Sequence, residues 1–285
     1  MRRLVPIAAL VVLAAAGATP AAAATPRFDA YVACSLHTED AAQRCSLGAT
    51  PAAVFRALAR REVSYRVCVR KPGGHTHCRR RTTGLRGEPS RAAIGLTGPG
   101  RYTVAWFVGD ARVERVQFRA RAPRVFVNGD SLAVGTKPYL PRALPGWPLT
   151  QSTSISRHAP EGVDLLRRQR NLARIVVMSL GTNDDPRATE TFGRAVRQAV
   201  GLVGRRGCVV WPNIVRPPVG GHSYAGYNAV LARLNRRFDR LLVVDWAQMV
   251  RENPQWMRSD GVHPDAEGYR ARAQAIAAKV RRCLD

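Results

Sequence analysis

One segment of this chain constrains its fold more than any other feature. Residues 174–180 read Arg-Ile-Val-Val-Met-Ser-Leu, without the polar alternation of a strand that has one face in water. Such a run is typical of a strand covered on both faces, as in a parallel sheet between helices. Further strands and helices alternate around it, which predicts an α/β fold with a parallel sheet and right-handed crossovers. We expect strands at 124–128, 149–154, 208–211 and 241–245, and helices at 161–170, 189–203, 224–238 and 264–282.

The chain before this region, residues 25–122, reads as short strands and turns. Apolar and polar residues alternate over 63–69, as in a half-buried strand, and the runs 102–108 and 113–118 around Gly109-Asp110 predict a hairpin. Residues 52–59 are expected to form one short helix. The pattern changes at 121–123, so we expect a small β-rich domain over 25–122 and an α/β domain over 123–285. The β domain shows no catalytic residues, which leaves it the roles of stability cap, spacer or envelope-binding surface.

Six cysteines favour an oxidising compartment, where disulfides persist. They are Cys34, Cys45, Cys68, Cys78, Cys208 and Cys283. The first four permit three pairings, and the sequence does not choose among them. Proximity favours Cys34–Cys45 and Cys68–Cys78. In an α/β layer Cys208 and Cys283 would both lie at the end of the sheet away from an active site, so a bridge between them is geometrically reasonable.

The first residues, 1–24, have the pattern of a secretory signal peptide. Met1-Arg2-Arg3 is a basic start, residues 4–16 are an apolar run, and Ala21 to Ala24 offer a small-residue cleavage site. The alternative is a retained membrane anchor, since the apolar run is only somewhat short of a span. We expect cleavage, no membrane span afterwards, and a secreted or cell-envelope location.

The formal net charge is +25, which raises the question of a polyanionic partner. Nearly all of the excess is arginine, with Lys71, Lys137 and Lys279 the only lysines, and such a bias also follows from a GC-rich genome. No nucleic-acid motif is present, so we expect no nucleic-acid partner. A basic exported protein would instead meet anionic envelope polymers or lipid head groups.

Three short motifs, each behind an expected strand, carry the chemistry. Ser131 stands on a small-residue turn after the strand 124–128, at the sheet edge where open α/β folds place their sites. Asp260 and His263 lie three residues apart, a spacing that lets the carboxylate orient the imidazole toward a distant serine. Asn183 follows the strand 174–180 and offers an amide as an oxyanion donor.

These motifs resemble those of the SGNH/GDSL hydrolase superfamily, whose name repeats the Gly-Asp-Ser-Leu string at 129–132. The resemblance covers roughly residue 124 to the C-terminus. It implies a flavodoxin-like three-layer α/β/α domain, a nucleophilic Ser131, catalytic Asp260 and His263, and an oxyanion hole that includes Asn183. The hole is completed in the family by the N–H of a glycine. Here Ser156 stands in that place, and its N–H would donate together with that of Ser131.

Neighbouring residues have simpler interpretations beside the functional one. Ser131, taken alone, could cap the following helix. Asp130, next to Gly129, is expected to fix the turn by local hydrogen bonds. Gly181 would give the Asn183 loop its tight backbone. His158 and His222 are rival bases, but neither has an acid at comparable spacing, so we interpret both as surface or pocket residues.

Two groups of residues invite a metal site, which we do not favour. His75, His77 and Cys78 lie close together, but zinc needs a further ligand pair at ordered spacing. Asp184 and Asp185 could form a metal site or a two-carboxylate glycosidase site. Turn and helix-cap roles fit them better, and we expect no metal and no organic cofactor.

The sequence thus predicts an exported serine esterase that hydrolyses carboxylic esters through a Ser-His-Asp triad. Candidate substrates are small esters, acyl lipids and O-acetyl or short acyl groups on envelope glycans. Two alternatives remain: an O-acyltransferase that uses the same triad, and an envelope-binding protein with weak catalysis.

Overall fold

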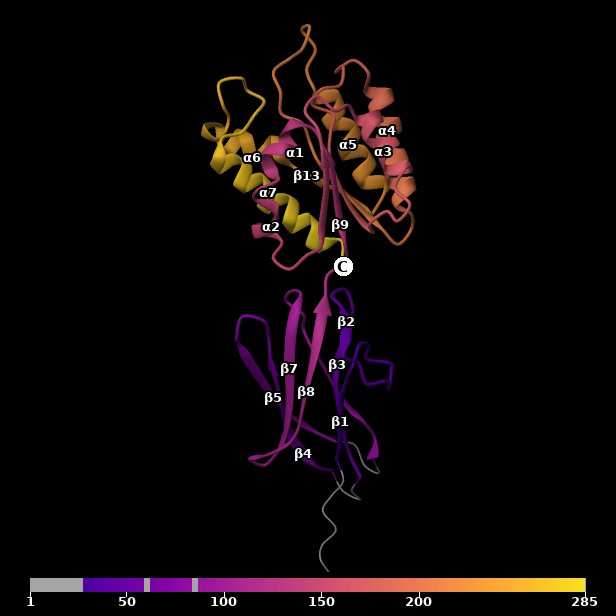
Figure 1. Ribbon diagram of the computed structural model, residues 1–285, viewed down its shortest axis with the longest axis vertical. Helices are drawn as coiled ribbons and strands as arrows, with labels where there is room; N and C mark the ends of the chain where they lie inside the picture. The colour runs from indigo at the N-terminus through magenta and orange to yellow at the C-terminus, as the bar shows by residue number, and fades with distance from the viewer. Residues whose placement is uncertain (1–27, 59–61, 84–86, 285) are drawn as a thin grey trace, which may run out of the picture.

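The computed structural model describes residues 28–58, 62–83 and 87–284, so the expected signal peptide lies outside the described residues. The molecule is elongated, with an all-β part at one end and an α/β part at the other (Figure 1). The chain passes from one to the other between β8 (Ala111–Arg121) and β9 (Val125–Gly129).

The β part consists of two sheets that face each other. One has three antiparallel strands in the order β1 (Phe28–Ala33), β3 (Ala52–Ala57), β6 (Ser90–Ala93). The other has the order β2 (Arg44–Ser46), β8, β7 (Gly100–Val108), β4 (Ser64–Arg70), β5 (Thr76–Thr82). Phe55 of the first sheet stacks on Tyr65 of the second, with ring centroids 4.4 Å apart. The two inner faces therefore share one core, which makes this part a sandwich.

The expectation of a helix over 52–59 was wrong. Residues 52–57 form β3, the central strand of its sheet, paired with β1 on one side and β6 on the other. Alanine and phenylalanine there are buried almost completely. The residues that pair with this strand lie between 19 positions away, as Ala33 does from Ala52, and 41 positions away, as Ala93 does from Ala52. Local propensity does not reflect such distant pairing. The predicted hairpin is confirmed, since β7 and β8 pair around Gly109-Asp110.

The α/β part has a sheet of five parallel strands. They are β9, β10 (Leu149–Thr153), β11 (Ile175–Ser179), β12 (Cys208–Pro212) and β13 (Leu241–Val244), in the spatial order β10-β9-β11-β12-β13. This is the flavodoxin-like order, in which the second strand lies on one side of the first strand and the later strands lie on its other side. The carboxyl end of β9 is consequently the point where a crevice opens.

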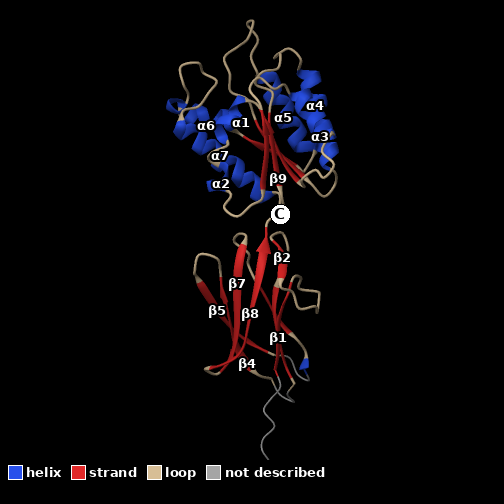
Figure 2. Cartoon of the chain, viewed as in Figure 1, coloured by secondary structure: helices blue, strands red, loops and turns tan. Residues whose placement is uncertain are grey.

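Helices cover both faces of this sheet (Figure 2). On one face lie α3 (Ala159–Arg167), α4 (Thr189–Val203) and α5 (Ala225–Arg237). On the other lie α1 (Ser131–Thr136), α2 (Leu140–Ala143), α6 (Trp246–Glu252) and α7 (Ala266–Arg282), with a short 3-10 turn at Pro254–Trp256. The fold class expected from the sequence is confirmed. A helix after the Ser131 turn was expected and is α1, whereas the short helices α2 and α6 were not expected.

Three disulfides join the pairs Cys34–Cys45, Cys68–Cys78 and Cys208–Cys283. The last ties the first residue of β12 to the end of α7, at the amino edge of the sheet. Within the described ranges, no helix combines the length and the apolar composition needed to cross a bilayer.

Candidate active site

The turn after β9 holds Ser131 at the carboxyl edge of the sheet. Asp130 is the N-cap of α1, where its Oδ1 accepts from the Leu132 N–H at 3.0 Å, so Ser131 is the first helical residue rather than the cap. The Asp130 N–H donates to the Ser179 carbonyl of β11 at 3.1 Å. Gly129 leaves no room for a side chain, because an added Cβ would lie 2.3 Å from Cβ of Ala133. These contacts fix the direction of the serine hydroxyl.

Ser131, His263 and Asp260 form one continuous chain of contacts. Ser131 Oγ lies 2.9 Å from His263 Nε2, and His263 Nδ1 lies 2.7 Å from Asp260 Oδ2. With the Nδ1 proton donated to the carboxylate, Nε2 is left to accept the serine proton. The serine and the histidine are 132 positions apart in the sequence.

The Asp260 carboxylate is locked by its own turn. The backbone N–H groups of His263 and Val262 both donate to Oδ1 at 2.9 Å. These bonds, the His263 backbone bond first, hold the pKa of Asp260 far below its usual range. The carboxylate therefore stays ionised beside the imidazole. Its side chain is 48% exposed and that of His263 is 34% exposed, so the chain of contacts lies open to solvent.

The expected oxyanion donors gather around the same turn. The Asn183 amide donates weakly, at 3.5 Å, to Oδ2 of Asp130 and to the Arg157 carbonyl. Ser156 lies just before Arg157 and has φ of +63°, the one positive φ of a non-glycine residue in the described chain. A left-handed backbone is what glycine adopts without strain, which is why glycine suits this position. Gly181 has φ of +116° in the Asn183 loop.

Arg157 is a residue of the site that the sequence interpretation missed. Its Nη1 group donates to Asn128 Oδ1 at 2.9 Å and to the Ser152 carbonyl at 2.5 Å, with a longer contact of 3.4 Å to the Gly129 carbonyl. The guanidinium thus joins the end of β10 to the end of β9. The feature of the sequence that could have indicated this role is the position of the arginine directly after Ser156.

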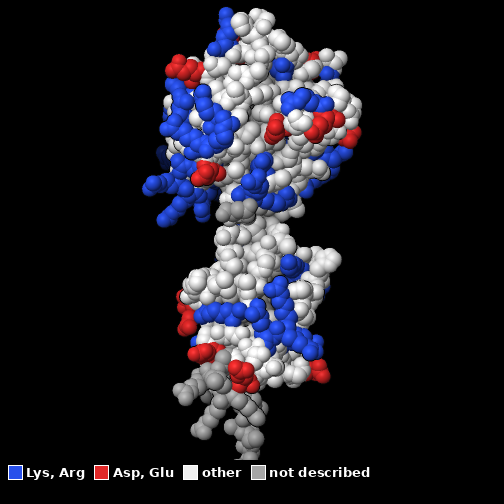
Figure 3. Space-filling model, turned by 180° about the vertical axis from the view of Figure 1, so that it is seen from behind, with Lys and Arg blue, Asp and Glu red and all other residues white. Residues whose placement is uncertain are grey.

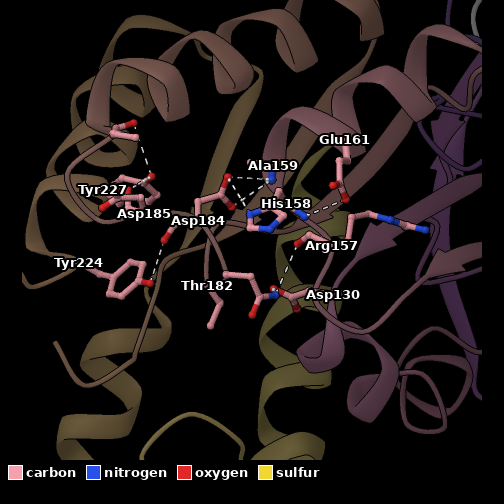
Figure 4. A network of polar contacts seen from close by, with 12 residues as sticks. Asp130, Arg157, His158, Ala159, Glu161, Thr182, Asp184, Asp185, Tyr224 and Tyr227 are labelled. Atoms are coloured by element: carbon pink, nitrogen blue, oxygen red, sulfur yellow. Dashed lines mark hydrogen bonds and ion pairs between the residues drawn. The ribbon is translucent and has the colours of Figure 1, made fainter. Parts of the chain in front are cut away.

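Asp184 and Asp185, the two acids that follow Asn183, make structural contacts within the protein (Figure 4). Asp184 accepts from the Ala159 N–H at 3.0 Å, and its carbonyl accepts from the Tyr224 hydroxyl at 2.9 Å. Asp185 pairs with Arg187 at 2.9 Å. Burial raises the pKa of Asp184. In the part of the chain that the structure describes, no three histidine, cysteine or acidic residues are grouped to hold a metal.

His158 and His222, the two alternative candidates for the base, contact other residues. Nδ1 of His158 is 3.8 Å from Oδ1 of Asp184, and His222 closes a small turn by backbone bonds to Val219. Neither has a hydrogen bond to Ser131 among the described contacts.

A loop after β12, residues 213–224, lies against the site. It projects beyond the carboxyl edge of the sheet (Figure 1). Arg216 donates to the Thr182 carbonyl, next to Asn183. Pro217 approaches Gly261 so closely that a Cβ there would lie 2.9 Å from its Cγ. The loop therefore contacts both the Asn183 loop and the His263 turn.

A buried arginine, Arg272, lies close to the turn that carries Ser131. Arg272 of α7 is 2% exposed, donates from Nη2 to Ser179 Oγ at 3.1 Å, and lies over the Trp246 ring. Its Nε and Nη1 find no hydrogen-bond partner among the described residues. Burial raises the pKa of Asp130 to about 6, and the charge of Arg272 opposes that rise. Burial also lowers the pKa of Arg272 to about 10.

Similarity to known proteins gives the family of the chain. Residues 111–271 match the GDSL-like Lipase/Acylhydrolase family. The chain belongs to this family. Membership confirms the resemblance seen in the Gly-Asp-Ser-Leu motif and makes the protein an acylhydrolase by family.

Named relatives are similar over the same region. The chain is 28% identical over 171 residues to Thioesterase 1/protease 1/lysophospholipase L1 of Escherichia coli (strain K12), which covers 52% of this chain and 78% of the relative. Among solved structures, the C-terminal catalytic domain of Streptococcus pneumoniae peptidoglycan O-acetyltransferase A has a TM-score of 0.46 at 18% identity, covering 57% of this chain and 93% of that one. A GDSL-like lipase from Bacteroides thetaiotaomicron has a TM-score of 0.44 at 17% identity, covering 56% and 88%.

Proposed function

We propose that the protein is a serine esterase that is exported from the cell and removes short acyl groups from a large carrier. The observation that carries this proposal is the unbroken chain of contacts from Ser131 through His263 to Asp260. A serine hydroxyl is a weak nucleophile until a neighbouring base takes its proton, and this chain supplies that base and its orienting acid.

In the acylation step, Ser131 Oγ attacks the ester carbonyl carbon while His263 Nε2 takes the hydroxyl proton. The negative charge that develops on the carbonyl oxygen is stabilised by the N–H groups of Ser131 and Ser156 and by the Asn183 amide. His263 then gives its proton to the alcohol oxygen as the ester C–O bond breaks. The products are the free alcohol and an acyl-Ser131 ester.

In the deacylation step, water replaces the alcohol. His263 takes a proton from water, whose oxygen attacks the acyl carbon, and returns a proton to Ser131 Oγ as that bond breaks. Asp260, ionised throughout, stabilises the imidazolium that forms twice in each cycle.

The openness of the site supports a large carrier with a small acyl group. The side chains of His263 and Asp260 are a third and a half exposed, so an ester that projects from a polymer can reach Ser131 without enclosure of the carrier. Export is supported by the three disulfides, which persist in oxidising compartments. The name of the Escherichia coli relative includes thioesterase and lysophospholipase, which makes thioesters and lysophospholipids necessary members of a substrate panel.

The test is a panel of p-nitrophenyl esters of increasing acyl length, together with an acyl thioester, a lysophospholipid and acetylated glycans. We expect hydrolysis that is fastest for acetyl and butyryl esters, and acetate release from the glycans. Ser131→Ala should lower kcat/KM by more than about a thousandfold. Ser154→Ala, in the exposed loop beside the site, is the matched control and should hydrolyse like the wild type.

A fluorophosphonate probe gives a readout that does not depend on the substrate. It should label the wild type and Ser154→Ala once per chain and should not label Ser131→Ala. Equal labelling of Ser131→Ala would exclude this serine as the nucleophile. Product that appears only when a sugar acceptor is added would instead assign acyl transfer.

A further inference from the structure

The sheet β2-β8-β7-β4-β5 has an outer face that is unusually rich in arginine. Side chains alternate between the two faces of a sheet. Tyr102, Val104 and Trp106 of β7 point into the sandwich core, so their neighbours in the strand point outward. The pairing register extends this division to the other four strands. The outward positions include Arg44, Arg66, Arg70, Arg80, Arg101, Arg112, Arg115, Arg119 and Arg121.

No acidic residue shares these outward strand positions. Glu114 of β8 is paired with Trp106 and belongs to the inner side, and Asp110 lies in the turn beyond the strands. None of the nine guanidinium groups has an ion pair or hydrogen bond with another described residue, although the backbone N–H of Arg115 donates to the carboxylate of the exposed Glu114 at 2.7 Å. Elsewhere in the molecule arginines do pair with acids, as Arg194 does with Glu190 at 3.0 Å.

Several of these arginines stand directly opposite one another. Arg66 is the register partner of Arg80, and Arg119 is the partner of both Arg101 and Arg44. Like charges in opposite positions destabilise a sheet. A basic composition alone places arginines on every surface, as the basic residues visible over both parts in Figure 3 show. It does not account for a single face that carries nine of them without an acid.

We propose that this outer face binds a linear polymer with repeated phosphate groups. Arginine binds phosphate oxygens with two parallel N–H groups, and strands about 4.8 Å apart bring several such groups within reach of one chain. At one end of the face Arg66, Arg80 and Arg81 line a hollow of ≈ 450 Å³, and the turn residue Asp110 lines it as well. Neutralising the opposed arginines would relieve their repulsion.

The face fits a phosphate polymer without bases better than it fits a bilayer or a nucleic acid. Its one aromatic residue is Phe107, and the Arg66 guanidinium lies over that ring at 4.8 Å, so no ring is free to stack on a base. Large exposed apolar side chains, which would insert into lipid, lie elsewhere among the described residues, as Ile155 and Val219 do. The binding would keep the enzyme on a phosphate-bearing polymer, independently of what its active site hydrolyses.

The test measures binding of long-chain inorganic polyphosphate at several salt concentrations. One variant replaces Arg70, Arg101, Arg115 and Arg119 by glutamine. A matched control replaces four exposed arginines of the α/β part by glutamine, namely Arg205, Arg233, Arg236 and Arg251. It therefore has the same net charge as the face variant. We expect the face variant to bind about tenfold or more weakly, with a salt slope lower by roughly three, and the control to lose less than about threefold.

Cooperative unfolding and circular dichroism establish that both variants fold. Polyphosphate should raise the Tm of the wild type and of the control, and it should raise the Tm of the face variant less. Equal loss of affinity in the two variants would overturn the proposal, because it would show attraction by net charge alone. Tighter binding to phosphatidylglycerol vesicles or to single-stranded DNA than to polyphosphate would also overturn it.

Discussion

Asp260 holds His263 through two different oxygens. Its Oδ1 accepts the His263 backbone N–H at 2.9 Å, and its Oδ2 lies 2.7 Å from the ring Nδ1. The same carboxylate therefore fixes both the backbone of the turn and the tautomer of the ring. An amide in its place keeps one acceptor oxygen and puts an NH₂ group where the other oxygen was.

We expect Asp260→Asn to lower kcat by at least about a thousandfold with little change in KM, because the ring tautomer and the imidazolium are no longer stabilised. Steady-state kinetics on a short-chain p-nitrophenyl ester measures this. Asp265→Asn, which alters the cap of α7 two residues beyond His263, is the control and should retain most of the activity. Near-normal turnover of Asp260→Asn would remove His263 from the mechanism and direct attention to His158 and His222.

Ser156→Gly should stabilise the protein. Ser156 has φ of +63°, a conformation that costs an L-residue about 1 kcal/mol and glycine much less. The backbone N–H is retained, so ester hydrolysis should remain. Chemical denaturation is expected to show an increase of about 0.5–1 kcal/mol in the free energy of unfolding. Ser154→Gly, in the same loop without a positive φ, should give no such gain, and equal effects of the two changes would contradict the assignment of strain.

Removing Cys208–Cys283 should destabilise the protein more than removing Cys68–Cys78. The first bridge spans 75 residues and the second spans 10, and a longer closed loop removes more entropy from the unfolded chain. Paired replacement by alanine is expected to cost about 4 kcal/mol for the first bridge and about 3 kcal/mol for the second. Denaturation under non-reducing conditions compares them. A larger loss from the Cys68–Cys78 pair would show that loop length does not control the effect.

The sequence predicts what depends on local pattern. The strand at 174–180 is apolar throughout, and the structure places β11 at the centre of the sheet between β9 and β12. The motifs at Ser131 and His263 each follow a strand and so are brought to one edge. The observed helix ends differ by a few residues from the predicted ends. The helix predicted from residue 264, for example, begins at Ala266, because the Asp265 side chain caps it by accepting from the Gly268 N–H at 2.7 Å.

The remainder depends on contacts between distant residues. Arg272 reads as one more polar residue of an amphipathic helix, and arginine is almost never fully buried without a partner. Only the packing of α7 against the sheet reveals that it lies under the Ser131 turn. The role of Arg157 likewise depends on its hydrogen bonds to the ends of two strands. Residues 52–57 form the strand β3 because strands pair with them on both sides.

The buried carboxyl of Asp130 provides a pH test of this packing. Its pKa is raised to about 6 in the folded protein, against 3.8 for an exposed aspartate, mainly by burial. A raised pKa means that the folded state holds the proton more tightly than the unfolded state. The stability that this contributes is fully present below pH 3.8 and is lost as the pH rises through 6. Asparagine keeps a capping oxygen for Leu132 but cannot take up a proton.

The last prediction compares wild type and Asp130→Asn by urea unfolding at pH 4 and pH 7.5. Replacing the protonated carboxyl by an amide changes stability by an offset that is the same at both pH values, and the ionisation of the wild-type carboxyl adds the part that depends on pH. The difference in unfolding free energy between the two proteins should shift toward the wild type by on the order of 2 kcal/mol on going from pH 7.5 to pH 4, because only the wild type gains from proton uptake. An unchanged difference would show that the pKa of Asp130 is the same in the folded and unfolded protein, so that the charge of Arg272 and the local hydrogen bonds cancel the effect of burial.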